Sequence, residues 1–366
     1  MLAADARRID YNLRGSAELG ARAAETDEQT AMWALVNQTP YAADRNWTRD
    51  KHGAHWWVVA VKASFTFAPD GRLTLADEQP PPVLAPEYTG KPGQSSLRYD
   101  SDLIAIKPGA ELLLVAHAHA PRGAPVSEVP VSVRLGRLEK SLVVYGERRY
   151  QQGALGLTTT PPRPFLTRPI EYELAYGGSD LSDPDPKRHG LDERNPVGRG
   201  YARQASRLVN APAHTIEYAR GDPARRGPAG FGPIDWGWLP RRKLAGTYDV
   251  RWAQTKKPLL PDDYDPRFAM SAPEDQCLAE PIAGGEPVEL VNLTPEGVLR
   301  FALPVVSLAL TTRIGRRVEA QPARLTTVLI EPEARRLSLV WQSVLRVRAP
   351  EVDYLDETEI VERRTG

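Results

Sequence analysis

The chain has 366 residues, with 47 basic and 47 acidic side chains and a formal net charge of zero. A neutral chain has no global field to attract nucleic acid or an anionic membrane. No apolar run approaches the roughly 20 residues that span a bilayer, and Met1–Asp10 lacks the apolar core of a signal peptide. The single Cys277 excludes an intrachain disulfide and fits a reducing compartment. We therefore expect a soluble, cytoplasmic protein without nucleic-acid binding or membrane insertion.

The amino-terminal part of the chain divides into an arm and a β-rich segment. Residues 1–30 carry few bulky apolar side chains, so we expect a mobile arm. Residues 31–175 are expected to form an amino-terminal β lobe. Its strongest signal is His55–Phe67, where β-branched and aromatic residues dominate and alternate with polar ones at the end. Further strands are expected at Trp33–Val36, Arg72–Leu75, Glu111–Ala118, Val129–Leu135, Leu138–Tyr145 and Ile170–Ala175.

The middle of the chain, residues 176–283, is crowded with glycine, proline and aromatic residues. Glycine reaches positive φ freely and proline fixes φ, so this composition is typical of loops with specified shapes. Disordered segments are poor in aromatic residues. The sequence therefore predicts a long, ordered, loop-rich region, and such regions are usually functional.

Strand signals return at close spacing in residues 284–350, which predicts a carboxy-terminal β meander. Its strands are expected at Val288–Leu293, Val298–Leu303, Leu308–Ile314, Ala323–Ile330 and Arg336–Val347. Residues 351–366 form a charged tail that we expect to fray. Together these signals predict an all-β protein, with antiparallel sandwich-like or barrel-like sheets in two lobes joined by the loop-rich centre.

Short motifs in a fixed order give the chain a family resemblance. The motifs are Trp33–Pro40, Val61–Phe65, Tyr99–Leu103, Lys107–Gly109, Val144–Arg148, Tyr176–Gly178, Asn195–Gly200, Ala229–Pro233, Gly246–Asp249 and Pro273–Gln276. In this order they resemble the bacterial "domain of unknown function 2169" family. The resemblance covers roughly Trp33 to Val347, so the amino-terminal arm lies outside it.

Function follows from this resemblance only by implication. Members are typically encoded in type VI secretion clusters, near spike proteins and toxic effectors, and are thought to load an effector onto the spike. The resemblance therefore implies a non-enzymatic adaptor or chaperone whose partners are a secreted toxin effector and a spike protein. It carries over no catalytic residue and no cofactor.

Two histidine pairs and two aspartate clusters were weighed as metal sites. His117 and His119 lie two residues apart at a strand end, where both imidazoles share one face. His52 and His55 form a second pair, but a tetrahedral site needs three or four donors and the sequence joins the pairs in no way. The aspartates at positions 180, 183, 185, 262, 263 and 265 lack the spacing of an EF-hand loop. Turn formation by Asp and Pro is the favoured interpretation, and we expect no metal.

Catalytic chemistry has equally incomplete support. Cys277 lies in the same region as His189 and His214, but an isolated cysteine is more often an inert apolar residue. A carbohydrate-active hydrolase with Asp249, Asp263 or Asp275 as acid and base is the alternative function. A glycan-binding module that stacks sugars on tryptophans is a third possibility.

The candidate interaction or loop-shaping residues lie in the loop-rich centre. They are Tyr176, Asn195, Phe231, Trp236, Trp238, Asp275 and Gln276. Exposed aromatic residues in a shaped loop make interface anchors, whereas buried ones form a small core beneath it; we favour burial, because tryptophan hides most of its surface. Asp275, Gln276 and Asn195 are expected to bridge loops through side-chain hydrogen bonds.

Overall fold

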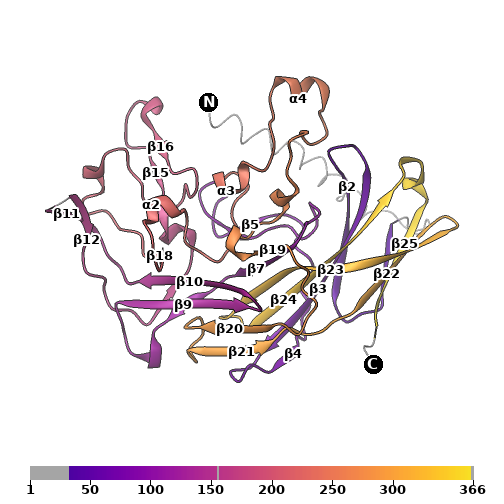
Figure 1. Cartoon of the computed structure of the whole chain (residues 1–366), viewed down its shortest axis with the longest axis horizontal. Coiled ribbons are helices and arrows are strands. Elements are labelled where there is room, and N and C mark those ends of the chain that lie inside the picture. The colour runs from indigo at the N-terminus through magenta and orange to yellow at the C-terminus, as the bar shows by residue number, and fades with distance from the viewer. Residues whose placement is uncertain (1–32, 155, 364–366) are drawn as a thin grey trace.

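The computed structural model describes residues 33–154 and 156–363, and the predicted arm at residues 1–30 lies outside this range. Strands dominate it and its helices are short, as Figure 1 shows, so the all-β prediction is confirmed. Two large sheets form the body, and the loop-rich centre lies along one side of them (Figure 1).

The larger sheet has ten strands and is nearly closed into a barrel. Its main path runs β1-β25-β22-β23-β24-β3-β2, and β4, β7 and β19 pair beside it. The bounds are β1 Ala34–Asn37, β2 Ala42–Arg49, β3 His55–Phe67, β4 Leu73–Leu75, β7 Ala110–Leu114, β19 Cys277–Leu278, β22 Leu308–Ile314, β23 Arg317–Glu331, β24 Arg336–Val347 and β25 Leu355–Glu362. The long strand β23 pairs with β22 through its first residues and in parallel with β7 through its last. One strand thus joins the barrel-like part to the part that carries β7.

The second sheet has five strands in the order β18-β10-β9-β20-β21. The bounds are β9 Glu128–Leu135, β10 Leu138–Tyr145, β18 Ile216–Tyr218, β20 Pro287–Val291 and β21 Val298–Ala302. Alternate residues of β9 are buried, because successive side chains of a strand point to opposite faces. The buried face packs into one hydrophobic core with residues of the ten-stranded sheet, such as Trp57 and Leu112.

Short ladders and helices build the rest. The ladders pair β5 Glu87–Tyr88 with β6 Leu97–Tyr99, β8 His117–His119 with β13 Thr167–Pro169, β11 Tyr150–Gly153 with β12 Gly156–Thr159, β14 Tyr176–Gly177 with β17 Arg199–Gly200, and β15 Ser179–Asp180 with β16 Gly190–Leu191. The α-helices are α2 Pro223–Arg226, α3 Leu239–Arg242 and α4 Val250–Thr255. The 3₁₀ helices span Pro121–Gly123, Tyr172–Leu174, Pro186–Arg188, Ala205–Leu208, Pro266–Ala269, Glu274–Gln276 and Ala349–Tyr354.

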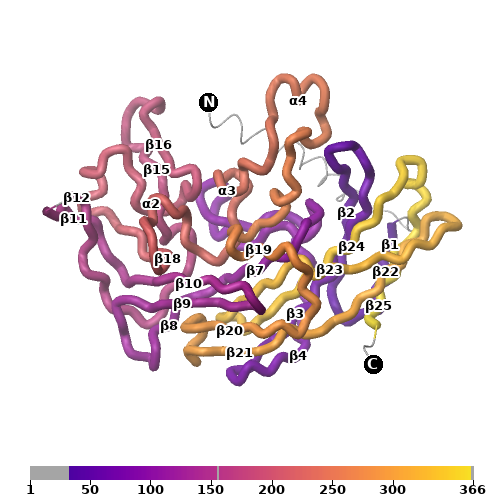
Figure 2. Tube along the Cα trace, in the orientation of Figure 1, coloured from indigo at the N-terminus to yellow at the C-terminus, as the bar shows by residue number. Residues whose placement is uncertain are grey.

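Each large sheet contains strands from both ends of the chain, so neither predicted lobe forms a sheet of its own. In Figure 2 the indigo and yellow segments lie side by side, and β3 pairs with β24 over twelve residues from His55 to Thr66. The predicted meander divides: β20 and β21 join the five-stranded sheet, and β22, β23 and β24 join the other.

Two local predictions were wrong. The charged tail was expected to fray, but its residues 355–362 form β25 between β1 and β22. Leu355, Thr358 and Ile360 are fully buried there. The acidic residues between them are more exposed, and their number made the segment resemble a charged tail in the sequence. The segment Ile170–Ala175, expected to be a strand, instead contains the 3₁₀ turn at Tyr172–Leu174, which buries Tyr172 and Leu174.

Candidate functional site

The loop-rich centre is attached to the sheets by a buried carboxylate. Glu111 of β7 has no exposed surface and accepts backbone N–H groups of Ser271 at 2.6 Å and Ala272 at 2.8 Å. Lys107 donates to Glu111 at 2.5 Å and to Thr327 at 2.6 Å. Burial by itself disfavours the charged amine, but Glu111 and Asp102 outweigh it and raise the pKa of Lys107. These contacts keep Lys107 in its charged form and fix the loop to β7 and β23.

A second buried attachment joins the loop to the five-stranded sheet. Lys140 of β10 donates to Asp275 at 2.9 Å and to Gln276 Oε1 at 2.7 Å. The Gln276 amide donates in turn to the carbonyls of Leu112 at 2.6 Å and Phe231 at 2.9 Å. Burial lowers the pKa of Lys140 to about 8. Asp275, Gln276 and Phe231 thus meet in one cluster that closes the seam between the two sheets.

A third attachment shapes the loop around Tyr176. Asn195 is almost fully buried and donates to the carbonyls of Tyr172 at 2.8 Å and Tyr176 at 3.0 Å. The N–H of Gly178 donates back to the Asn195 carbonyl at 2.7 Å. A Cβ on Gly177, whose φ is +148°, would overlap that carbonyl, so only glycine fits. The Tyr176 ring is half-buried and meets the edge of His214 at 5.5 Å.

The predicted aromatic residues lie mainly inside the loop region. Phe231 and Trp238 are 1% and 5% exposed, and Trp238 packs edge-on against Tyr172 at 5.3 Å. Trp236 is half-buried, and its indole N–H donates to Asp100 at 3.1 Å. Asp100 also binds the buried guanidinium of Arg241 at 2.7 Å. Trp238 consequently offers no open face on which a sugar ring can stack.

Sequence reasoning missed the buried charged residues that hold the loop-rich centre in place, namely Asp100, Lys107, Glu111 and Lys140. A weak signal existed for two of them. Glu111 and Lys140 occupy positions within strands where neighbouring side chains are buried. A charge at such a position requires a partner, but the partner loop lies about 135 to 160 residues away along the chain.

The predicted nucleophile and its histidines do not come together. The Cys277 thiol lies beside the carbonyls of Ala272 and Pro273, and burial raises its pKa to about 12. His189 contacts the Asp183 carbonyl at 2.8 Å, whereas His214 contacts the Tyr150 hydroxyl at 2.7 Å. The hypothesis of a Cys/His pair is therefore wrong.

The aspartates weighed as metal ligands or acid–base groups hold turns and ion pairs. Asp249 caps α4 by accepting the N–H of Trp252 at 2.8 Å, and Asp263 accepts both the N–H and the hydroxyl of Thr247. The other aspartates have equivalent roles: Asp180 binds Arg207, Asp185 caps a 3₁₀ turn, Asp262 binds Lys256 and Asp265 binds Arg267. Within residues 33–154 and 156–363, no group of three or more His, Cys, Asp or Glu is arranged to hold a metal.

His117 and His119 share one face of β8, as predicted from their spacing. Both reach the same carboxylate oxygen of Glu333, at 3.2 Å and 3.1 Å. The other pair is separate: the His55 ring accepts the indole N–H of Trp47 at 3.0 Å. The hydrogen bond to Glu333, which lies in the turn between β23 and β24, raises the pKa of His117.

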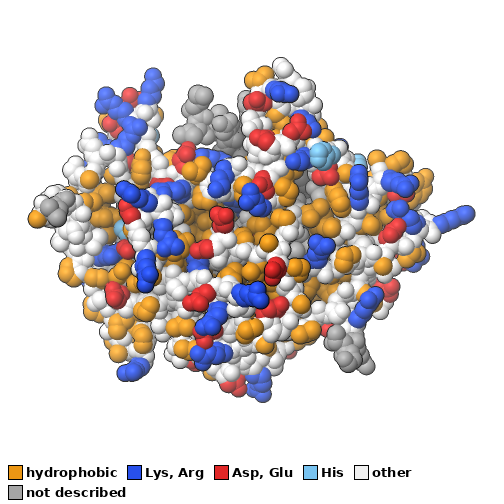
Figure 3. All heavy atoms as spheres, in the orientation of Figure 1, with side chains coloured by type: hydrophobic (Ala, Val, Ile, Leu, Met, Phe, Trp, Pro, Cys, Tyr) orange, Lys and Arg blue, Asp and Glu red, His pale blue; other side chains and the backbone are white. Residues whose placement is uncertain are grey.

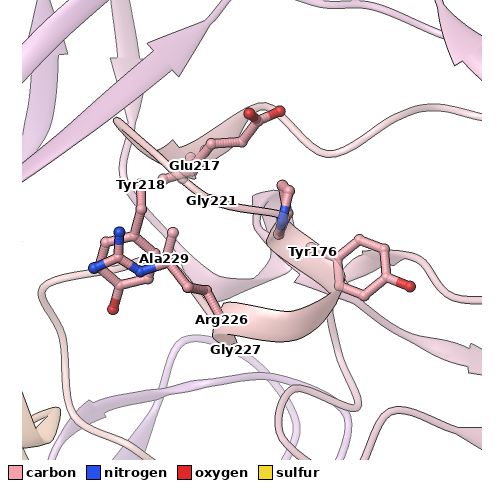
Figure 4. A pocket seen from close by; sticks show the side chains of 9 residues that line it. Tyr176, Glu217, Tyr218, Gly221, Arg226, Gly227 and Ala229 are labelled. Carbon is pink, nitrogen blue, oxygen red and sulfur yellow. The ribbon is translucent and has the colours of Figure 1, made fainter.

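Two hollows of the described surface are small. One, drawn in Figure 4, is lined by Tyr176, Glu217, Tyr218 and Arg226. The Arg226 guanidinium lies 4.2 Å from the centre of the Tyr218 ring. This hollow encloses no space for a water molecule. The other lies among the charges around Lys107 and Glu111 and has about 20 Å³, enough for one water molecule. Neither accommodates a substrate of the usual size.

The fold and these contacts define an all-β protein whose long loop region is held in one shape by buried polar side chains. A family model described as an uncharacterized protein conserved in bacteria, DUF2169, matches residues 52–342. The chain belongs to this family. Searches among curated proteins and among solved structures gave no match. Of the helices in the described ranges, none has the length and apolar character needed to cross a membrane.

Proposed function

We propose that the protein is a non-enzymatic adaptor or chaperone that binds a type VI secretion effector and helps to load it onto the spike. The observation that carries the proposal is a loop-built surface with two projections, in a region that buried charged side chains attach to both large sheets. The family resemblance supplies the identity of the partners. As part of the same proposal, the protein acts in the cytoplasm and contacts neither nucleic acid nor the membrane interior.

The first projection is the finger formed by residues 179–191, which includes β15 and β16 (Figure 1). Its base is fixed by Asp180, which accepts the Ser182 hydroxyl at 2.6 Å and binds Arg207 at 3.1 Å. Leu181, which lies between Asp180 and Ser182 in the sequence, is 61% exposed. The finger thus holds an apolar side chain in solvent on a fixed backbone.

The second projection is formed by residues 247–262, which include α4 (Figure 1). It has a small core of its own: Trp252 packs against Tyr248 at 4.7 Å, and its indole N–H donates to the Leu259 carbonyl at 2.8 Å. Lys51, in the turn before β3, contacts the second projection by donating to the Asp262 carbonyl at 2.9 Å. Val250, on the outside, is 69% exposed.

Both projections rise from the same side of the molecule, as Figures 1 and 3 show. Apolar side chains held on rigid supports bind with little loss of conformational entropy, which favours recognition of a folded partner. Neither of the two hollows described above is large enough to serve as a substrate cleft, which favours binding over catalysis. No contact in the described residues favours the alternative of a carbohydrate-active enzyme or glycan-binding module.

The experiment is co-expression of the tagged protein with each toxin and spike protein encoded beside it, followed by measurement of complex formation. We expect one effector to copurify and to bind at least about tenfold more weakly to the variants Leu181→Asp and Val250→Asp. Val318→Asp is the matched control, because Val318 is 63% exposed on β23, outside both projections. Failure of every pair to copurify would contradict the proposal, and so would equal weakening by the control.

A further inference from the structure

Strand β1 lies at one end of the barrel-like sheet and pairs with a single neighbour. It pairs in parallel with β25 over four residues, Ala34 to Asn37. Its other edge makes no backbone hydrogen bond to any described residue, because β1 ends the path of the sheet. Parallel pairing is also slightly less stable per residue than antiparallel pairing. By contrast β25 is held on its other side by antiparallel pairing with β22 from Leu308 to Ile314.

Side chains, not backbone, close the seam between β1 and β2. Arg45 of β2 donates to the Trp33 carbonyl at 2.8 Å, and the rings of Trp33 and Trp47 stack at 5.9 Å. The edge of β2 is satisfied without β1, since Asp44 accepts the N–H of Arg45 and Asn46 that of Trp47, each at 2.8 Å. Opening this seam therefore leaves no unpaired amide at those two positions of β2.

The residue that precedes β1 is strained. Trp33 has a φ of +65°, a conformation that bulky side chains rarely adopt. Its ring also packs against the main hydrophobic core, as does Leu35. The strap formed by residues 33–37 is thus attached by one short ladder, by the apolar side chains of Trp33 and Leu35, and by two further hydrogen bonds of Trp33: its carbonyl accepts from Arg45 and its indole N–H donates to the Val352 carbonyl at 3.1 Å.

The edge of β25 beneath the strap carries acidic side chains on its outer face. Glu357 lies opposite Ala34 and Glu359 opposite Val36, so the strap places neutral residues beside both carboxylates. Glu357 binds Arg313, but Glu359 makes no ion pair within the described residues and accepts only the amide of Gln38, at 2.6 Å. A strand with basic outward side chains would complement this edge better than β1 does.

We propose that the edge of β25 is the acceptor for an extended segment of a partner polypeptide, and that β1 is an internal strap that occupies this edge until the partner replaces it. The segment would alternate apolar residues, which enter the positions of Trp33 and Leu35, with lysine or arginine beside Glu357 and Glu359. Main-chain hydrogen bonds give such strand addition its affinity, and the alternating side chains give it specificity. The identity of the partner as an effector rests on the proposed function.

Hydrogen exchange of the unmodified protein is the first test. We expect the amides of Trp33 and Gln38, which donate to β25, to exchange at least about a hundredfold faster than amides of β22 that donate to the same strand. This pattern would show that β1 detaches while the sheet stays intact. Equal protection of β1 and β22 would overturn the proposal.

The second test uses labelled synthetic peptides of residues 33–38, with lysine at positions 34 and 36 in one and glutamate in the other. We expect the lysine peptide to bind at least about tenfold more tightly, and to bind the Trp33→Ala variant more tightly than the native chain. Glu359→Gln should reduce the preference for lysine, whereas Glu139→Gln, on the exposed face of β10, should leave it unchanged.

Absence of lysine preference on the native chain would overturn the proposal, even if the Trp33→Ala variant fails to fold. Neither test uses an effector. A failure here is therefore distinct from failure of copurification, which would contradict the adaptor function and leave the strap in place.

Discussion

The five-stranded sheet and the loop-rich centre reach an ordered state by different physical means. The sheet buries alternate apolar side chains, such as Val131 and Leu142, and many neighbours share the stabilisation. The loop region has little regular structure and depends on Glu111, Lys140 and Asn195, each of which satisfies several polar groups at once. Order in the loops is therefore concentrated in a few polar contacts, and the two regions should respond differently to substitution.

The largest expected effect comes from Glu111→Ala. It leaves Lys107 buried without its partner and frees two loop N–H groups, so we expect a loss of about 3–5 kcal/mol in the free energy of unfolding. Chemical denaturation measures this loss, and limited proteolysis should cut residues 231–276 before either sheet. Glu139→Ala, on an exposed position, is the control with an expected change within about 0.5 kcal/mol. Cleavage of the sheets first would show that the loops do not depend on this carboxylate.

Leu142→Ala tests the other half of the comparison. Leu142 is fully buried in β10, so its truncation removes transfer free energy and leaves a cavity, with an expected cost of about 3 kcal/mol. Unfolding should remain a single cooperative transition when followed by both circular dichroism and tryptophan fluorescence. Separate transitions for the two probes would mean that the sheet and the loops are not coupled through the shared core.

Asn195→Ala should have a smaller and local effect. The substitution removes donors to two backbone carbonyls, with an expected loss of about 1–3 kcal/mol. Hydrogen exchange should rise at Gly178 and in the neighbouring ladder of β14 with β17, while β9 and β10 keep their protection. A loss of protection spread evenly over the chain would contradict the local role that we assign to this amide.

The smallest effect is expected at the contact between His117 and Glu333. The hydrogen bond to Glu333 raises the pKa of His117 above 6.5, so its contribution is present below pH 6.5 and is lost as the pH rises through the higher folded value. The pKa of Glu333 is lowered from 4.5 by the same contact despite its burial, so that contribution is lost as the pH falls below 4.5. The pair should stabilise the fold most between these limits, by at most about 1 kcal/mol, because both side chains are over one third exposed.

Titration of the His117 ring by NMR checks this prediction. Glu333→Gln should return its pKa toward the ordinary value, and an unchanged titration would show that the shift has another origin.

Sequence predicted the elements that follow from local pattern and missed those that depend on distant partners. The bounds of β3 and the hairpin of β9 with β10 agree with the alternation in their residues. Strand β2 was missed because Ala-Ala-Asp-Arg-Asn-Trp-Thr-Arg has no clear alternation, and its conformation is set by pairing with β3. The partners of Gln276 and Asn195 were likewise unpredictable, since a buried amide does not specify which carbonyl it will reach.

The position of β25 has a consequence for biosynthesis. This strand lies within the barrel-like sheet, paired with β1 on one side and β22 on the other. The earliest described strand therefore has no backbone partner until residues 355–362 have left the ribosome. Such long-range pairing slows folding, and the barrel-like sheet stays incomplete until this strand is added.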